Sequence, residues 1–198
     1  MSQNKLIIGV TGGSGAGKGE VCRVLADFGA QILDADKIAH SVIKKGATPA
    51  YDEILAVFGN QILGAGNEIN RKILGDIVFA DKGKLAQLSQ IVHKHVIYAI
   101  NKAVKTSDNS VIAIDAPVLV EAGVDKMCHA VIGVFAPHEM RINRIIARDG
   151  LTRKSALARI NSQMPDAELA RHITHKVDND GDFQHLYNQI TKITRVIL

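Results

Sequence analysis

The 198-residue sequence predicts an α/β fold in which helices flank a parallel β-sheet. Two apolar runs near the N-terminus, "KLIIGVTG" from Lys5 and "AQILDAD" from Ala30, are short and nearly continuous. Such runs are typical of parallel strands whose two faces are both covered. Between them, residues 18–29 carry apolar side chains at helical spacing and end in glycine. The order strand, helix, strand is a βαβ unit, which builds right-handed parallel sheets.

The rest of the chain adds strands to this unit and interrupts it with helices. The runs "SVIAIDAPVLV" and "HAVIGVFAP" predict two further buried strands that end in proline-containing loops, and "THKVDND" is a weaker candidate. Residues 50–105 have helical periodicity with almost no strand signal, over a length too great for an ordinary crossover connection. We expect them to form a helical lobe inserted at the edge of the sheet. A further helical stretch, rich in arginine, follows from Pro137.

Composition and charge limit the kinds of partner. The net charge of +4, from 24 basic and 20 acidic residues, suits an anionic ligand but is too small to indicate nucleic acid. With three Tyr, five Phe and no Trp, few side chains could stack on bases. The two cysteines lack C-x-x-C spacing, and the N-terminal apolar run is shorter than a signal peptide or a membrane span. We therefore expect a soluble cytoplasmic protein with neither nucleic-acid nor membrane partners.

The segment "GVTGGSGAGKGE" resembles a phosphate-binding loop. Gly12, Gly17 and Lys18 fit the pattern G-x-x-x-x-G-K-[ST], and the segment follows a predicted strand and opens a predicted helix, as that pattern requires. Glycines let the backbone wrap a phosphate, and the N-terminus of a helix favours negative charge. Neither the spacing of a dinucleotide-binding G-x-G-x-x-G nor the N-K-x-D of a GTPase is present. The expected ATP-binding residues are Gly12, Gly13, Ser14, Gly15, Ala16, Gly17, Lys18, Gly19 and Glu20.

The loop departs from its pattern at Gly19, where a serine or threonine hydroxyl would bind Mg²⁺. The backbone N–H groups remain and can still hold phosphate. Mg²⁺ readily retains several waters, so we expect it to be held through the ATP phosphates and water, with no assigned protein ligand. The alternative is that metal binding and turnover are lost. Glu20 as a substitute ligand is geometrically doubtful.

Two further groups are candidates for the chemistry. Asp34 and Asp36 end the second predicted strand, where open α/β sheets bind ligands, and strand alternation would place both carboxylates on one face. An aspartate there could orient an attacking hydroxyl or accept its proton, although an ordinary pKa near 4 makes it a weak base. The alternative is a pair of turn or helix-cap residues. Arg144 and Arg148 share a helix face and either clamp phosphate or form a solvated surface.

A series of segments in this order resembles the dephospho-coenzyme A kinase family: "GVTGGSGAGKGE", "ILDADKIAH", "YDEILAVFG", "INRKILGDIVF", "IVHKHV", "DAPVLVE", "RDGLT" with "ARINSQM", and "VDNDG". The resemblance covers nearly the whole chain. It implies transfer of the γ-phosphoryl group of ATP to the ribose 3′-hydroxyl of dephospho-CoA, with Mg²⁺, giving CoA and ADP in the last step of coenzyme A biosynthesis. It also implies a P-loop kinase domain over residues 1–198, with a core of about 1–45, 108–140 and 170–198, a helical CoA-binding lobe of about 46–107, and a mobile lid of about 141–169.

The resemblance also implies roles for particular residues. Gly13–Lys18 would hold the ATP phosphates, and Asp34 would be the base. The catalytic set would be Lys18, Asp34, Arg144 and Arg148, and the acceptor site would include Asp34, Arg71, His93, Pro117 and Glu121.

Four positions depart from the family pattern. Gly19 and Glu20 replace Ser-Thr, Lys94 replaces the usual proline, and Asn70 replaces an aspartate. Two alternatives therefore stay open: a kinase of another small alcohol or nucleotide, and a nucleotide-binding protein that is catalytically impaired.

Overall fold

The structure is a computed structural model that describes residues 5–197. The chain divides into two compact units, one formed by Met1–Leu33 with Asp108–Leu198 and the other by Asp34–Ser107. Residues 1–4, which the sequence analysis assigned to the core, and residue 198 lie outside the described residues.

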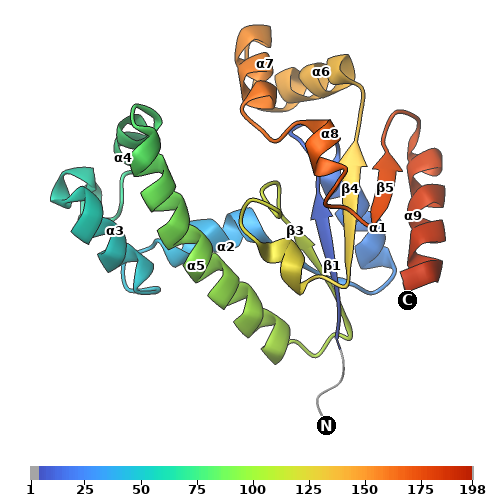
Figure 1. Cartoon of the computed structure of the whole chain (residues 1–198), viewed down its shortest axis with the longest axis horizontal. Helices are drawn as coiled ribbons and strands as arrows, with labels where there is room; N and C mark the ends of the chain where they lie inside the picture. The colour runs from blue at the N-terminus through green and yellow to red at the C-terminus, as the bar shows by residue number, and fades with distance from the viewer. Residues whose placement is uncertain (1–4, 198) are drawn as a thin grey trace. The chain divides into compact units, whose positions relative to one another are not determined.

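A five-stranded sheet with the order β2-β3-β1-β4-β5 organises the chain. Figure 1 labels β3, β1, β4 and β5 of this sheet. Strand β1 pairs in parallel with β3 on one side and β4 on the other, and β4 pairs in parallel with β5. The predicted α/β class with a parallel sheet is therefore confirmed. The strands are β1 (Leu6–Thr11), β2 (Gln31–Asp34), β3 (Val111–Asp115), β4 (Ala130–Phe135) and β5 (His175–Asp178).

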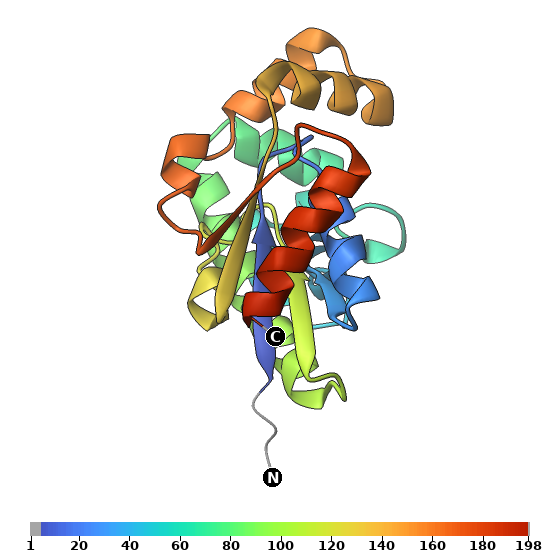
Figure 2. The same cartoon turned by 90° about the vertical axis from the view of Figure 1, so that its right-hand side faces the viewer.

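Helices α1 (Lys18–Asp27) and α9 (Phe183–Ile197) pack against each other and against the sheet, and Figure 2 shows α9 lying across its strands. Apolar side chains from β1, β4 and both helices form one core, in which Ile8, Leu25 and Ile132 are at most 1% exposed. Burial of such apolar surface is the main driving force for forming the sheet layer.

Beyond the carboxyl ends of the strands lie α6 (His138–Asp149) and α7 (Arg153–Asn161) (Figure 1), and the short α8 (Asp166–Leu169) follows them in the chain. The arginine-rich stretch is thus two helices rather than one, because Gly150 adopts a left-handed conformation with φ of 65° and ends α6. A separate apolar cluster joins α6 to α7 through Ile142, Ile145, Ala156 and Ile160. The 3₁₀ helix Val124–Met127 precedes β4.

The unit Asp34–Ser107 is helical, as predicted for residues 50–105. The 25-residue helix α5 contacts the other three α-helices of this unit. The unit has a hydrophobic core that includes Ile54, Phe58 and Ile62. Among residues 5–197, no helix is both long and apolar enough to cross a bilayer. The α-helices of the unit are α2 (Ala35–Val42), α3 (Ala50–Phe58), α4 (Arg71–Phe79) and α5 (Lys82–Thr106), with 3₁₀ helices at Asn60–Ile62 and Ala65–Asn67.

Candidate active site

The glycine loop lies at the centre of the sheet's carboxyl edge. It leaves β1 after Thr11 and enters α1 at Lys18. In the sheet, Val10 is in register with Asp115 of β3, and Thr11 with Gly133 of β4. The loop therefore starts where the connections from the central strand switch from one side to the other, which is the ligand-binding position of open parallel sheets.

The backbone of the loop runs so close to its neighbours that side chains are excluded at several of its glycines, among them Gly12 and Gly17. Gly12 has φ of 148°, and a Cβ there would lie 2.4 Å from the carbonyl oxygen of Val134. Gly17 has φ of 98°, and a Cβ there would lie 2.0 Å from Nδ2 of Asn179. Lys18 folds back over the loop and donates from Nζ to the Gly12 carbonyl at 2.9 Å. The sequence pattern of a phosphate loop thus corresponds to a compact loop with a lysine at its end.

The two predicted arginines occupy different environments. Arg144 donates to the carbonyl oxygens of Gly15 at 3.3 Å and Ala16 at 3.4 Å, so its positive charge lies directly against the loop. Arg148 instead forms a two-pronged ion pair with Asp149, with both hydrogen bonds at 2.8 Å, and its side chain is 61% exposed. The structure therefore brings Arg144, but not Arg148, to the loop.

Three residues that the sequence analysis did not select also hold the loop. Asn179, which follows β5 and is buried, donates from Nδ2 to the Ala16 carbonyl at 2.8 Å. Gln163 accepts the N–H of Ser14 at 2.7 Å, and Arg141 donates from Nε to the Ser14 carbonyl at 3.0 Å. Asn179 comes directly after the strand end in "VDND", so its position was a usable signal. Arg141 and Gln163 have no comparable local pattern.

The place of the missing hydroxyl is open. Gly19 is exposed, and a Cβ there would have no heavy atom within 4 Å. The carboxylate of Glu20 pairs with Arg23, one turn further along α1. Asp115 places a partly buried carboxylate at the end of β3, in register with β1 just before the loop. Hard oxygen ligands of this kind suit Mg²⁺, which commonly binds protein through one or two carboxylates and retained waters.

The structure corrects one expectation about the second strand. Strand β2 ends at Asp34, and Asp36 already belongs to α2, so the two carboxylates do not share a strand face. The reason is helix capping: Asp34 accepts the backbone N–H of Lys37 at 2.9 Å and thereby starts α2. Partial burial acts to raise the pKa of Asp34, but hydrogen bonds and an ion pair with Lys37, with Nζ at 3.1 Å, outweigh it and lower the pKa.

The expected acceptor-site residues are divided between the two units. Arg71 is exposed at the start of α4, and His93 is partly buried on α5. Pro117 and exposed Glu121 follow β3 in the other unit, where the Thr11 hydroxyl donates to the Pro117 carbonyl over a long 3.5 Å.

Asn70, which stands where the family pattern has an aspartate, caps α4. Its side chain accepts the N–H groups of Lys72 at 3.1 Å and Ile73 at 3.2 Å. Asparagine and aspartate cap helices about equally well. The start of α4, and with it the placement of Arg71, therefore does not depend on this substitution.

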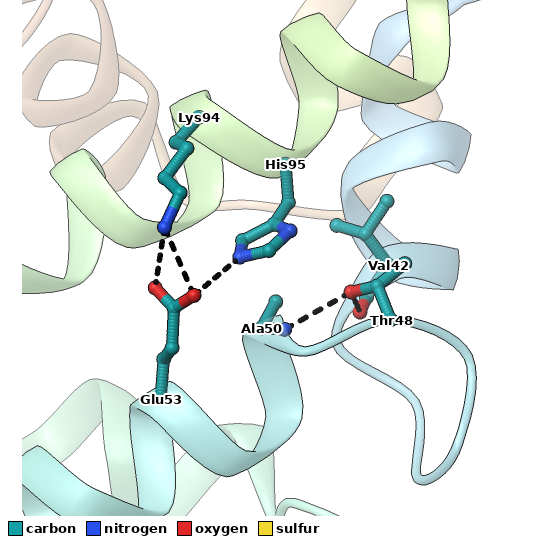
Figure 3. A network of polar contacts seen from close by, with 6 residues as sticks. All are labelled: Val42, Thr48, Ala50, Glu53, Lys94 and His95. Carbon is teal, nitrogen blue, oxygen red and sulfur yellow. Dashed lines mark hydrogen bonds and ion pairs between the residues drawn. The ribbon is translucent and has the colours of Figure 1, made fainter. Parts of the chain in front are cut away.

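A polar network not predicted from the sequence joins α3 to α5 (Figure 3). Glu53 accepts from Lys94 Nζ at 3.0 and 3.3 Å and lies 3.0 Å from Nε2 of the buried His95. Close by, the Thr48 hydroxyl donates to the Val42 carbonyl at 2.6 Å and accepts the N–H of Ala50 at 3.1 Å. Lys94, at a position of departure from the family pattern, thus helps to fix the helices of this unit.

A glycine loop between a buried strand and a helix, at the switch point of a parallel sheet and with lysine and arginine against it, defines the class of P-loop phosphotransferases. A solved shikimate kinase from Acinetobacter baumannii shares this fold, with a TM-score of 0.57 at 16% identity over 98% of this chain and 94% of that one.

Within that class the chain belongs to the dephospho-CoA kinase family, whose sequence model matches residues 6–185. A dephospho-CoA kinase from Fusobacterium nucleatum is 35% identical over 192 residues, which are 97% of this chain and 98% of the relative. One from Carboxydothermus hydrogenoformans is 38% identical over 94% of this chain and 92% of the relative. The solved dephospho-CoA kinase from Campylobacter jejuni superposes with a TM-score of 0.68 at 25% identity, over 96% of each chain.

Proposed function

We propose that this protein transfers the γ-phosphoryl group of ATP to the ribose 3′-hydroxyl of dephospho-CoA, giving CoA and ADP in the last step of coenzyme A biosynthesis. The observation that carries the proposal is the compact phosphate loop with Lys18 and Arg144 against it, in a chain of this family. The partners are the two small-molecule substrates, ATP and dephospho-CoA. Because both are intracellular metabolites, we place the reaction in the cytoplasm.

In this proposal the phosphate loop, residues 12–20, positions the triphosphate. Lys18 and Arg144 offset the negative charge of the phosphoryl group that is transferred. Phosphoryl transfer needs little covalent help from the protein, so positioning and charge stabilisation supply most of the catalysis. Lys18 and Arg144 already lie against the loop backbone and can turn to phosphate oxygens without a large rearrangement. Arg148, which is paired with Asp149, would join them only if a movement within the lid, residues 141–169, brought it to the site and excluded water.

Asp34 would orient the acceptor hydroxyl. Its pKa is lower than that of an ordinary aspartate, because the opposing effect of burial is outweighed by hydrogen bonds with Lys37. A carboxylate with a lowered pKa is a poor proton acceptor but keeps its negative charge, so it accepts a hydrogen bond from the hydroxyl through the reaction. Arg71, His93, Pro117 and Glu121 would bind the remainder of dephospho-CoA.

The residues near the loop are compatible with Mg²⁺. Asp115 would hold the ion, through a retained water, in place of the hydroxyl absent at Gly19. When bound, Mg²⁺ would neutralise charge on the β- and γ-phosphates. Glu20 is less suitable, because its carboxylate is paired with Arg23.

One observation favours a second function, nucleotide binding without catalysis: position 19 lacks the metal-binding hydroxyl. Both functions are tested by incubating the purified protein with ATP, Mg²⁺ and dephospho-CoA and measuring CoA and ADP. We expect CoA in proportion to ADP. ATP binding without CoA formation, reversed by Gly19→Ser, would establish the second function instead.

A panel of acceptors tests the substrate assignment. Nucleoside monophosphates, shikimate and dephospho-CoA would be supplied separately under the same conditions. We expect only dephospho-CoA to be phosphorylated efficiently. Phosphorylation of a nucleoside monophosphate but not of dephospho-CoA would overturn the proposed substrate and leave the kinase activity in place.

A further inference from the structure

The peptide at Ser14 is held from both sides by residues that come much later in the chain. Its N–H donates to Oε1 of Gln163 at 2.7 Å, and its carbonyl accepts from Nε of Arg141 at 3.0 Å. Arg141 belongs to α6, and Gln163 lies between α7 and α8. The helical segment beyond the sheet thus supplies a partner to each backbone polar group of a residue in the middle of the phosphate loop.

Arg141 is packed into the loop. Its side chain is 5% exposed, and its Nη1 binds both carboxylate oxygens of Asp166, at 3.0 and 3.3 Å. A Cβ on Gly13 would lie 1.9 Å from Nη2 of Arg141, and a Cβ on Gly15 would lie 2.5 Å from its carbonyl oxygen. The absence of side chains at these two loop positions is therefore what allows Arg141 to approach.

A buried guanidinium is costly to leave without hydrogen-bond partners. If α6 moved away from the loop, the hydrogen bond from Arg141 to the Ser14 carbonyl would break. If the segment carrying Gln163 moved with it, the hydrogen bond from the Ser14 N–H to Gln163 would break as well. The orientation of the Ser14 peptide is therefore tied to the position of the α6–α8 segment. The peptide also sets the direction in which the following amides of the loop point.

We propose that Arg141 and Gln163 are positioning residues of the phosphate loop, which fix the Ser14 peptide and thereby couple the α6–α8 segment to nucleotide binding. Neither side chain needs to touch ATP, because both act through the loop backbone. The inference rests on the proposed assignment of this loop to ATP. It adds that nucleotide affinity depends on two residues outside the phosphate-loop motif, and by linkage that nucleotide binding orders α6–α8.

Gln163→Ala is the first test, because Gln163 is only partly buried and its loss should leave the fold intact. Loss of one hydrogen bond that orients a binding loop should raise the KM for ATP about 5- to 10-fold and change kcat less than about 2-fold. The KM for dephospho-CoA should not change. Ser162→Ala, at the preceding and exposed position, is the matched control and should retain the wild-type KM for ATP.

Arg141→Lys and Arg141→Met form the second test. Lysine keeps the positive charge but cannot donate to both the Ser14 carbonyl and the Asp166 carboxylate as the planar guanidinium does, and methionine cannot donate to either. Both variants should therefore weaken ATP binding about 10-fold or more. Arg153→Met is the control, because Arg153 lies in the same segment but pairs with the exposed Glu139. Titration with a non-hydrolysable ATP analogue and thermal unfolding would separate a binding defect from a loss of stability.

Amide hydrogen exchange distinguishes coupling to nucleotide binding from a purely structural role of Arg141 and Gln163, because a purely structural role would not change the response to nucleotide. In the wild-type protein, the ATP analogue should slow exchange in residues 138–169 as well as in the loop, whereas in Gln163→Ala the slowing should be confined to the loop. Unchanged ATP affinity in a folded Gln163→Ala protein would overturn the inference even if wild-type protein forms CoA. Conversely, wild-type protein that binds ATP but forms no CoA would count against the proposed function alone.

Discussion

Gly19 stands where the phosphate-loop pattern has a serine or threonine, and a Cβ at this position would have no heavy atom within 4 Å. Gly19→Ser should therefore be accommodated without strain and add an oxygen near the metal. Replacing a water by a well-placed ligand is worth about 1 kcal/mol, so the Mg²⁺ concentration for half-maximal activity should fall about fivefold. Initial rates of ADP formation measured across a Mg²⁺ titration would check this.

Gly19→Ala is the matched control for that substitution. Removing glycine from the first turn of α1 should by itself stabilise the helix by up to about 1 kcal/mol, with either serine or alanine. Only serine should change the dependence on Mg²⁺. Equal shifts for the two variants would mean that the effect comes from the helix and not from a metal ligand.

Replacing Asp34 by asparagine distinguishes its role as the N-cap of α2 from a role in the reaction. Asn in its place should still cap α2, since asparagine and aspartate are nearly equal at that position, so the melting temperature should hardly change. The KM for ATP should also stay near the wild-type value. Loss of the negative charge should lower kcat by about 100-fold or more if the carboxylate orients the acceptor hydroxyl.

The comparison for Asp34→Asn is Asp36→Asn, an exposed carboxylate in the first turn of the same helix. Steady-state kinetics with dephospho-CoA as the varied substrate would report both variants. Wild-type turnover in Asp34→Asn would remove this residue from the reaction.

At the scale of elements, the sequence predicted strands and helices whose apolar spacing is regular and several of whose ends are marked by glycine or proline. It failed where a side chain changes the path of the backbone: Asp34 captures the N–H of Lys37 and starts a helix where a strand was expected. The sequence also could not predict which distant residues form hydrogen bonds to the backbone of the phosphate loop. Arg141 and Gln163 lie 127 and 149 positions from Ser14, and nothing in their local pattern distinguishes them from solvated residues.

The packing of α3 against α5 should depend on pH. Hydrogen bonds from Lys94 and then His95 hold the pKa of Glu53 below its ordinary value near 4.5. A lowered pKa means that the ionised form is favoured in the folded state, so its contribution is complete above about 4.5 and is lost as the pH falls through the lower folded value. Glu53→Gln should therefore lower the melting temperature modestly at pH 7, and the difference from wild type should shrink below pH ~4.5.

Thermal unfolding of both proteins between about pH 3 and 8 at constant ionic strength would measure that difference. Asp52→Asn, at the neighbouring carboxylate of α3, controls for the loss of one negative charge from the helix. A difference that stays constant over the whole pH range would show that Glu53 acts through packing and not through its charge.

At the scale of the whole molecule, the chain has two compact units with separate cores. The phosphate loop, Arg144 and Asn179 belong to the unit that contains most of the sheet, whereas Asp34, Arg71 and His93 belong to the helical unit. Because each unit has its own core, the binding of ATP and of the acceptor should respond to different core substitutions.

Ile54→Ala and Ile132→Ala test this division. Both side chains are fully buried, Ile54 in the helical unit and Ile132 in the sheet, and each truncation should cost about 2–5 kcal/mol. We expect Ile54→Ala to raise the KM for dephospho-CoA while the affinity for an ATP analogue stays within about twofold. Ile132→Ala, which loosens the strand beside the loop, should weaken ATP binding. Calorimetric titration and thermal unfolding of both variants would measure these effects, and equal loss of ATP affinity in the two would mean that the units do not behave independently.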